Sequence, residues 1–216
     1  MLKNDLVSLT FSIIAIFALA TATAQAEESS PQRLMVFGDS LTAGYGLASE
    51  DSLPAQLQRA LRERGHAVTV INAGVSGDTT SGGLSRLEWT LADDPQAVIL
   101  ALGANDGLRG INPGLTRDNL QQMLEIMQQR ELPVLLLGML APPNLGRDYG
   151  EAFNAIYPDL AEEYSVLLYP FFLEDVVGEP QLNLEDGIHP NRQGVAVVVD
   201  NILPLVEQLL QQIETQ

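Results

Sequence analysis

The sequence of 216 residues contains no cysteine. Without cysteine the chain forms no disulfide, offers no thiolate ligand to zinc or to an iron–sulfur cluster, and has no thiol nucleophile. An N-terminal lipid anchor on cysteine is excluded for the same reason. Any catalytic group must therefore come from hydroxyl, carboxylate, imidazole or amide side chains.

Basic residues are also scarce: the chain has one lysine, Lys3, ten arginines and 28 acidic residues, for a formal net charge of −17. So acidic a surface repels nucleic acid and anionic membranes, and we expect neither as a partner. The expected partner is a small-molecule substrate, and we expect the protein to be a monomer.

The N-terminal apolar run, from Phe11 to Ala20, is shorter than the ~18 residues that a membrane span needs. It follows Lys3 and precedes the small-x-small sequence Ala24-Gln25-Ala26. This pattern is typical of a secretory signal peptide over residues 1–26, cleaved after Ala26. We expect a periplasmic or secreted protein with no stable membrane anchor, and a retained N-terminal anchor is the alternative. Residues 27–216 then suit a single domain.

Short apolar runs alternate five times with helical patterns along this domain. The runs lack the polar/apolar alternation of a half-exposed strand, which favours a parallel sheet with helices on both faces. We therefore predict an α/β fold, a three-layer α/β/α sandwich with a five-stranded, mostly parallel sheet resembling that of flavodoxins. The expected strands are 34–37, 68–72, 97–101, 134–137 and 166–169, and the expected helices are 54–64, 84–91, 115–130, 149–164 and 191–212.

In such a fold the turns that follow the strands lie at one edge of the sheet. Five polar or glycine-rich segments from distant parts of the sequence are then expected to form one crevice. These segments are Ser40, 74–79, 103–107, 141–146 and 186–189.

Ser40 follows the first strand and Gly38, at a point where the chain turns sharply. Gly38 permits such a turn because it has no Cβ. A serine held there can serve as a nucleophile, or it can simply cap a helix.

A serine nucleophile needs a base, and the base needs a group that fixes its tautomer. His66 is expected in a solvent-exposed turn at the opposite edge of the sheet, which leaves His189 as the candidate base. Asp186 lies three residues before His189, so one tight turn can join the two. The alternative is that both are capping or turn residues before the last helix.

The Gly77 N–H and the Asn105 amide are candidate donors to an oxyanion, although both residue types are also common in turns. Ser76 is a rival nucleophile, but Asp78 breaks the nucleophile-elbow motif there. Four aspartates could suggest a hard cation; without the spacing of a recognised metal loop we expect no metal site. These are Asp39, Asp78, Asp106 and Asp186.

Four ordered blocks resemble those of the SGNH (GDSL) hydrolases. They are Gly38-Asp39-Ser40-Leu41, Gly77-Asp78-Thr79, Gly103-Ala104-Asn105-Asp106 and Asp186-Gly187-Ile188-His189-Pro190. Residues 103–110 and 151–158 resemble the periplasmic thioesterase I / lysophospholipase / arylesterase branch of this family. Ala104 departs from the second glycine that is frequent in that branch.

The resemblance implies that Ser40 is the nucleophile, His189 the base and Asp186 its orienting partner. It also implies an oxyanion hole made by the Ser40 and Gly77 amides and the Asn105 side chain. The expected activity is hydrolysis of aryl and alkyl esters, lysophospholipids and acyl thioesters through an acyl-enzyme, with no cofactor.

The apolar, proline-containing loop 140–145 is the expected wall for the acyl chain, because binding pockets are mostly apolar. It is alternatively a rigid surface loop. The candidate substrate-binding residues are Leu140, Ala141, Pro142 and Leu145. Arg109 and Arg147 are candidate contacts for an anionic head group, or else solvated charges.

Two other functions remain open at this point. A carbohydrate deacetylase of the same fold would accept only acetyl groups. A flavodoxin-like binding module would hold a flavin phosphate at the first turn, but it leaves Asn105 and the segment 186–189 without roles.

Overall fold

The computed structural model describes residues 30–215, so the predicted signal peptide lies outside the described residues. Five strands form one parallel sheet in the order β2-β1-β3-β4-β5. This is the flavodoxin-like order, and the predicted fold class is confirmed. The strands are β1 (Gln32–Gly38), β2 (Val68–Gly74), β3 (Ala97–Ala101), β4 (Val134–Leu137) and β5 (Leu167–Tyr169).

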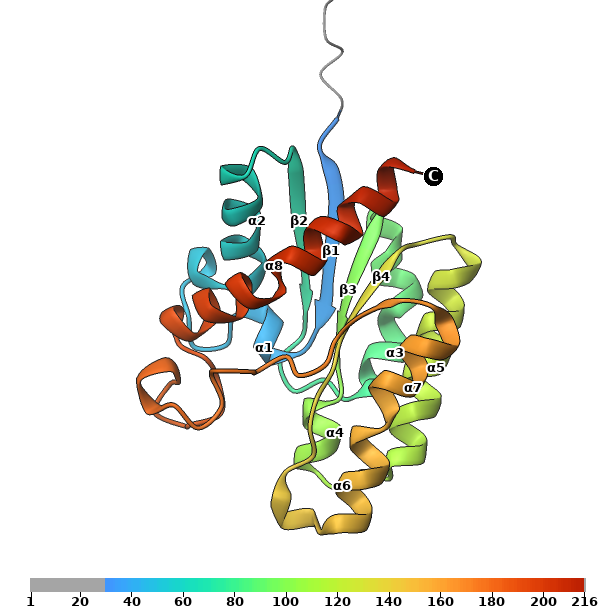
Figure 1. The fold of residues 1–216 in the computed structure, drawn as a ribbon, viewed down its shortest axis with the longest axis vertical. Helices are drawn as coiled ribbons and strands as arrows, with labels where there is room; N and C mark the ends of the chain where they lie inside the picture. Colours follow the sequence, from blue (N-terminus) through green and yellow to red (C-terminus); the bar gives the residue numbers. More distant parts are fainter. Residues whose placement is uncertain (1–29, 216) are drawn as a thin grey trace, which may run out of the picture.

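Helices cover both faces of the sheet (Figure 1). One face carries α2 (Leu53–Glu63) and α8 (Arg192–Glu214), which also pack against each other. The other face carries α3 (Thr80–Thr90), α5 (Pro113–Gln129) and α7 (Ile156–Tyr164). The three layers follow from the sequence, because strands that are apolar on both faces need a helix layer on each side.

The core lies on both sides of β1, β3 and β4, whose apolar side chains are almost wholly buried. The 23-residue α8 is long and apolar enough to cross a membrane by length and composition alone. Its apolar stripe, from Val195 to Leu210, is instead buried against the sheet. This pattern is that of a core helix in a globular domain.

The predicted helix 149–164 is wrong in one respect: it is two helices, α6 (Arg147–Asn154) and α7. The break at Ala155 has a physical cause in Pro158. Proline has no N–H for the Asn154 carbonyl, and its ring collides with that carbonyl in a continuous helix.

Two short helices begin directly after strands where only turns were expected. They are α1 (Ser40–Ala43) after β1 and α4 (Ala104–Leu108) after β3. Helices of four and five residues are too short to produce a hydrophobic period, which explains why the sequence did not reveal them.

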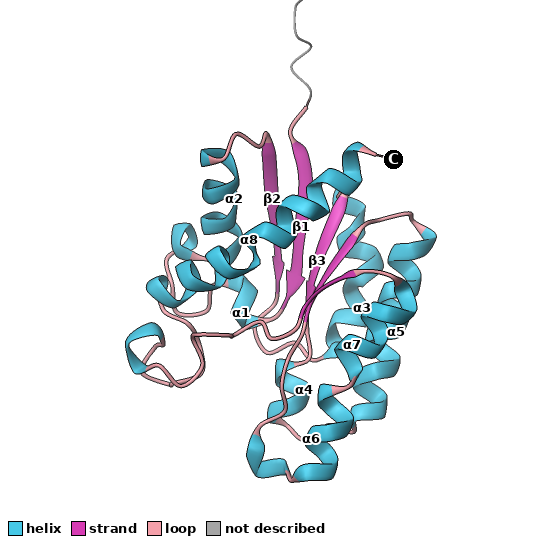
Figure 2. Cartoon of the chain, in the orientation of Figure 1, coloured by secondary structure: helices cyan, strands magenta, loops and turns pink. Residues whose placement is uncertain are grey.

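The carboxyl ends of the central strands lie at one level, because Gly38 of β1 is in register with Gly74 of β2 and Ala101 of β3. The turns that follow these strands therefore share one edge of the sheet (Figure 2). This edge carries the candidate site.

Candidate active site

Ser40 is the first residue of α1, and Asp39 caps this helix by accepting a hydrogen bond from the Leu41 N–H (3.0 Å). The alternative that Ser40 is merely the cap is therefore wrong. Gly38 is needed for the turn, because a Cβ there would lie 2.6 Å from the carbonyl oxygen of Ala101. The Ser40 hydroxyl is thus free of a capping role and is held at the end of β1.

Ser40 Oγ lies 2.9 Å from Nε2 of His189, and Nδ1 of His189 lies 2.7 Å from Oδ2 of Asp186. An unbroken hydrogen-bond chain therefore runs from hydroxyl to imidazole to carboxylate. Such a chain can move a proton off the hydroxyl while the carboxylate fixes the imidazole tautomer. The three predicted residues, which span 149 positions of sequence, lie together.

Asp186 also accepts hydrogen bonds from two backbone N–H groups through Oδ1, those of His189 (3.0 Å) and Ile188 (2.9 Å). These backbone donors, followed by the His189 ring, lower the pKa of Asp186 to about 2. The turn uses Gly187 at a φ of +68°, a conformation that favours glycine. Asp186 is therefore a carboxylate at neutral pH.

The segment that carries His189 is anchored on both sides. The Leu184 N–H donates to the His189 carbonyl (2.8 Å), and Asn183 pairs with Pro190 in an isolated bridge. The side chain of Asn191 then caps α8 by accepting from the N–H groups of residues 193 and 194. Capping is thus done by Asn191, and not by Asp186 or His189.

Gly77 sits in the turn after β2 with a φ of +86°. This turn is tied to the Ser40 turn, because the Val75 N–H donates to the Gly38 carbonyl (3.0 Å). Arg86 strengthens the tie by donating to Asp78 Oδ2 (2.7 Å) and to the Gly38 carbonyl (2.9 Å). Within residues 30–215, the Gly77 N–H donates to no protein acceptor. It is therefore available to a ligand.

Asn105 lies in α4, and its Nδ2 donates to Oδ2 of Asp39 (3.2 Å). Its Oδ1 accepts a hydrogen bond from Arg109 (3.3 Å). Asp39 is 1% exposed, and burial raises its pKa to about 6 against the opposing effects of the Leu41 and Asn105 hydrogen bonds. Asp39 thus contacts Asn105, a predicted oxyanion donor, as well as stabilising the turn.

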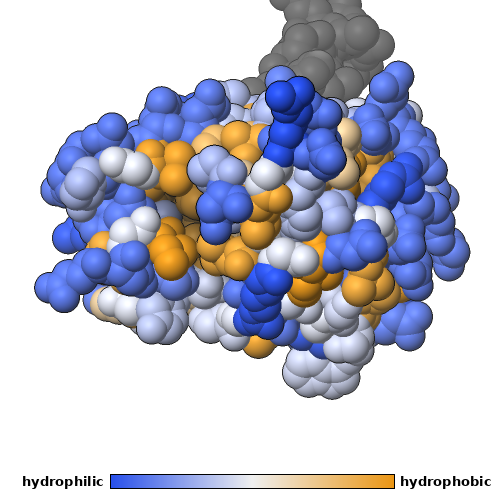
Figure 3. Space-filling model, turned by 90° about the horizontal axis from the view of Figure 1, so that it is seen from below, coloured by the Kyte–Doolittle hydropathy of each residue, from blue (hydrophilic) through white to orange (hydrophobic). Residues whose placement is uncertain are grey.

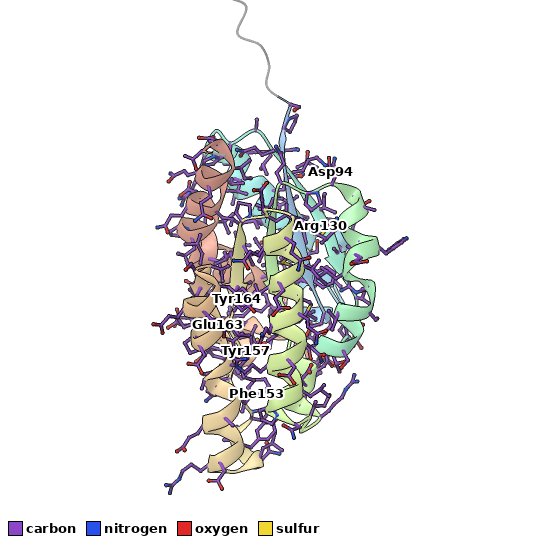
Figure 4. The ribbon with its side chains drawn as sticks, turned by 90° about the vertical axis from the view of Figure 1, so that its right-hand side faces the viewer. Asp94, Arg130, Phe153, Tyr157, Glu163 and Tyr164 are labelled. Atoms are coloured by element: carbon purple, nitrogen blue, oxygen red, sulfur yellow. The ribbon has the colours of Figure 1, made fainter. Side chains whose placement is uncertain are left out.

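Aromatic side chains of α6 and α7 support the start of α4 from behind. Tyr157 Oη donates to the Leu102 carbonyl (3.0 Å), and a Cβ on Gly103 would lie 2.0 Å from this Oη. Phe153 packs edge-on against Tyr157 and lies beside it in Figure 4. Only glycine therefore fits at position 103, directly before the helix that carries Asn105.

The other two aspartates that could suggest a cation site, Asp78 and Asp106, have hydrogen-bond partners within the protein. Asp106 is fully buried and accepts from the Thr80 N–H (2.8 Å), the Thr80 hydroxyl (2.5 Å) and the Thr116 hydroxyl (3.2 Å). Asp78 pairs with Arg86. Both carboxylates join the turns of this edge to the helices behind them.

A cleft of about 370 Å³ opens beside Ser40, His189 and Asn105. Apolar side chains gather on this face of the molecule among hydrophilic ones (Figure 3). The lining includes three of the four predicted substrate-binding residues, Leu140, Ala141 and Pro142.

The fourth of these predicted residues, Leu145, is not among the residues that line this cleft. The chain turns in a 3-10 helix at Pro143–Leu145, and the Leu145 side chain lies next to Gly110 instead. Sequence reasoning also missed apolar lining residues from other segments, which are Leu41, Ala104, Leu108, Met139, Phe171, Leu173, Val177 and Ile188. Most of these lining residues come directly after a strand or lie in irregular segments, where the sequence has no hydrophobic periodicity that would predict their position.

His66 lies before β2, at the opposite edge of the sheet from Ser40 as predicted. It is half-buried rather than exposed, because Nε2 contacts Glu207 of α8 (3.2 Å). Ser76 is exposed in the turn after β2, and His189 contacts Ser40 and not Ser76.

Two further residues contact the predicted catalytic groups, although sequence reasoning assigned no catalytic role to either. Tyr45 stacks on His189, and Arg109 bonds to Asn105 and Gly77. Arg109 was expected to meet a ligand head group or solvent. Arg109 follows Asn105 by four residues, a spacing that brings two side chains together on a helix, but the sequence did not reveal α4 and so did not indicate the contact.

Comparison with known proteins shows that the GDSL-like Lipase/Acylhydrolase family model matches residues 36–197. An arylesterase of Vibrio mimicus is 44% identical over 180 residues, which is 83% of this chain and 88% of the relative. The thioesterase 1/protease 1/lysophospholipase L1 of Escherichia coli K12 is 43% identical over 168 residues, 77% of this chain and 79% of the relative. The crystal structure of TesA superposes with a TM-score of 0.78 at 41% identity, covering 82% of this chain and 99% of that chain.

Proposed function

Because the chain belongs to the GDSL-like lipase/acylhydrolase family, we propose that it cleaves carboxylic ester and thioester bonds with Ser40 as nucleophile. The chain is a carboxylic ester hydrolase, in keeping with relatives named arylesterase and thioesterase/lysophospholipase. The observation that carries the residue assignment is the hydrogen-bond chain from Ser40 through His189 to Asp186.

In the first step, Ser40 Oγ attacks the carbonyl carbon while neutral His189 accepts the hydroxyl proton at Nε2. Asp186, ionised and bonded to Nδ1, stabilises the imidazolium that forms. The tetrahedral intermediate then collapses, and His189 gives the proton to the leaving alcohol or thiol. Water attacks the resulting acyl-enzyme by the same route and releases the acid.

The oxyanion of the intermediate is proposed to be held by the Ser40 and Gly77 N–H groups and by Nδ2 of Asn105. One hydrogen of Nδ2 bonds to Asp39, and the other is left for the oxyanion. Donors fixed before the reaction stabilise developing charge without reorganisation.

The cleft supports an acyl chain as the group that the enzyme recognises, because its lining is mostly apolar. We infer that esters and lysophospholipids are the cellular substrates, since the net charge of −17 disfavours polyanionic thioesters such as acyl-CoA. An apolar cleft also favours an acyl hydrolase over a deacetylase that accepts acetyl groups alone.

Export is part of the proposal: residues 1–26 act as a cleaved signal, and 27–216 form one monomeric domain. Mass spectrometry of the protein isolated from the periplasm should give an N-terminus at Glu27. An intact N-terminus in the membrane fraction would show that the segment is retained as an anchor.

The nucleophile is tested by Ser40→Ala, with Ser76→Ala as the matched control on the neighbouring turn. Hydrolysis of nitrophenyl esters should fall by a factor on the order of 1,000 or more in Ser40→Ala and stay at the wild-type rate in Ser76→Ala. If Ser40→Ala keeps more than a few per cent of turnover while folded, Ser40 is not the nucleophile.

A further inference from the structure

Arg109 is an exposed residue that closes α4, four positions after Asn105. Its Nη2 atom donates two hydrogen bonds, one to the Gly77 carbonyl (2.9 Å) and one to Oδ1 of Asn105 (3.3 Å). One nitrogen with two hydrogens thus joins the two turns that carry the proposed oxyanion donors. The two turns are also joined where the Thr80 N–H and hydroxyl donate to Asp106, the residue after Asn105, but that contact involves neither proposed donor.

The orientation of the Asn105 amide follows from its two charged neighbours. A guanidinium only donates, so the atom that faces Arg109 must be the oxygen. A carboxylate only accepts, so the atom that faces Asp39 must be the nitrogen. The two contacts together exclude the flipped amide, which would turn the oxygen toward the oxyanion.

The positive charge of Arg109 also affects the Asn105 amide. A guanidinium bonded to the carbonyl end of an amide draws electron density from its N–H groups, which strengthens their hydrogen bonds. The positive charge also offsets the nearby carboxylate of Asp39, which would otherwise oppose a developing oxyanion.

On the basis of the function proposed above, we propose that Arg109 is a positioning residue that holds the Gly77 and Asn105 donors in register and orients the Asn105 amide. Arg109 acts through these two residues and does not touch the substrate. Arg86 holds the same turn through Asp78 and ties it to the Gly38 carbonyl at the end of β1, so two arginines contact this turn.

The test compares Arg109→Met with Arg130→Met. Both remove one guanidinium and keep most of the side-chain volume, but Arg130 ends α5 just before β4 begins, at the edge of the sheet opposite to the site. In Figure 4 it lies well apart from Phe153 and Tyr157. We expect kcat for nitrophenyl butyrate to fall between about 10-fold and 100-fold in Arg109→Met, with little change in KM. Arg130→Met should match the wild type.

Two further measurements separate positioning from a general structural effect. A short alkyl boronic acid, which forms a tetrahedral adduct on serine, should lose affinity for Arg109→Met by the same factor as kcat/KM. In Arg109→Ala, added guanidinium below denaturing concentrations should restore part of kcat, and it should not raise the rate of Arg130→Ala.

A kcat of Arg109→Met equal to that of Arg130→Met overturns the proposal. A change seen only as a higher KM for anionic substrates also overturns it, because it would indicate that Arg109 contacts the substrate head group. If Arg109→Met proves less thermostable than Arg130→Met, the rescue experiment with Arg109→Ala decides. If added guanidinium then fails to restore kcat, the proposal is overturned. Failure of the proposed function is seen separately, as hydrolysis that persists in Ser40→Ala.

Discussion

The ring of Tyr45 lies over the imidazole of His189, with centroids 4.5 Å apart and ring planes inclined by 37°. Tyr45 lies just beyond α1, and its N–H donates to the Ser40 carbonyl (3.3 Å). The residue that covers the proposed base is therefore fixed to the same helix as the proposed nucleophile. In the proposed mechanism, the aromatic ring stabilises the positive charge that develops on the imidazole when His189 accepts the Ser40 proton.

Replacing Tyr45 by alanine should lower kcat/KM for nitrophenyl esters by about 2- to 5-fold. This factor corresponds to the ~0.5–1 kcal/mol of a cation–π contact at an exposed site. Tyr45→Phe keeps the ring and should retain the wild-type rate. Equal losses in Tyr45→Phe and Tyr45→Ala would mean that the hydroxyl, and not the ring face, is what matters.

Asp186→Asn should lower kcat by a factor on the order of 100 to 10,000, because an amide can present its nitrogen to Nδ1 and favour the wrong tautomer. Asn can still accept from the Ile188 and His189 N–H groups, so the turn should persist. Steady-state kinetics with circular dichroism as the control for folding would check this. A variant with near wild-type kcat would show that Asp186 only shapes the turn.

Asp39 should make stability depend on pH. Its pKa is about 6 in the folded protein and 3.8 when unperturbed, mainly because of burial. Between these values the folded state keeps a proton that the unfolded state has lost, so the free energy of unfolding falls as pH rises from about 4 to about 6. Asp186 contributes in the opposite direction and at lower pH, where stability is lost as pH falls from 3.8 towards 2.

Urea unfolding of the wild type and Asp39→Asn at pH 4 and pH 7 would isolate this effect. The stability of the wild type minus that of the variant should be smaller at pH 7 than at pH 4, by up to about 3 kcal/mol. A difference that is the same at both pH values would show that the buried carboxyl does not titrate in this window.

The sequence predicted the layers and the site edge because both depend on patterns that persist over many residues. Apolar runs such as 97–101 can only be buried strands here, and parallel strands bring their exit turns to one edge. His189 was the candidate base because the chain has only two histidines and His66 was expected at the opposite edge of the sheet. The resemblance to the SGNH hydrolases then implied the full set of Ser40, His189 and Asp186.

What the sequence did not predict depends on single side-chain contacts across the fold. The stacking of Tyr45 on His189 joins segments 144 positions apart, and no local pattern encodes it. The Arg109 bond to Gly77 is similar, because it depends on where two loops meet. The position of Leu145 outside the cleft lining is of the same kind, because its side chain lies next to Gly110, a residue of a different loop.

The acyl-chain preference should depend on Ala141, which lines the cleft beside Leu140 and Pro142. Its backbone N–H donates to Oδ1 of Asn154 (2.8 Å), a bond that a larger side chain leaves intact. Ala141→Phe should therefore narrow the cleft without releasing the loop. We expect the ratio of kcat/KM for octanoyl over acetyl nitrophenyl esters to fall by roughly 10-fold or more, since excess volume in an apolar pocket costs about 1–3 kcal/mol.

Leu145→Phe is the matched control for this prediction, because it adds an aromatic ring to the same loop outside the cleft. The ratio should stay at the wild-type value in this variant, since its side chain lies toward Gly110 and away from the acyl chain. A ratio that falls equally in both variants would mean that the loop, and not the cleft wall, sets the preference. An unchanged octanoyl-to-acetyl ratio in Ala141→Phe would place the acyl chain outside this cleft, because a phenyl ring there would occupy the space that an octanoyl chain needs.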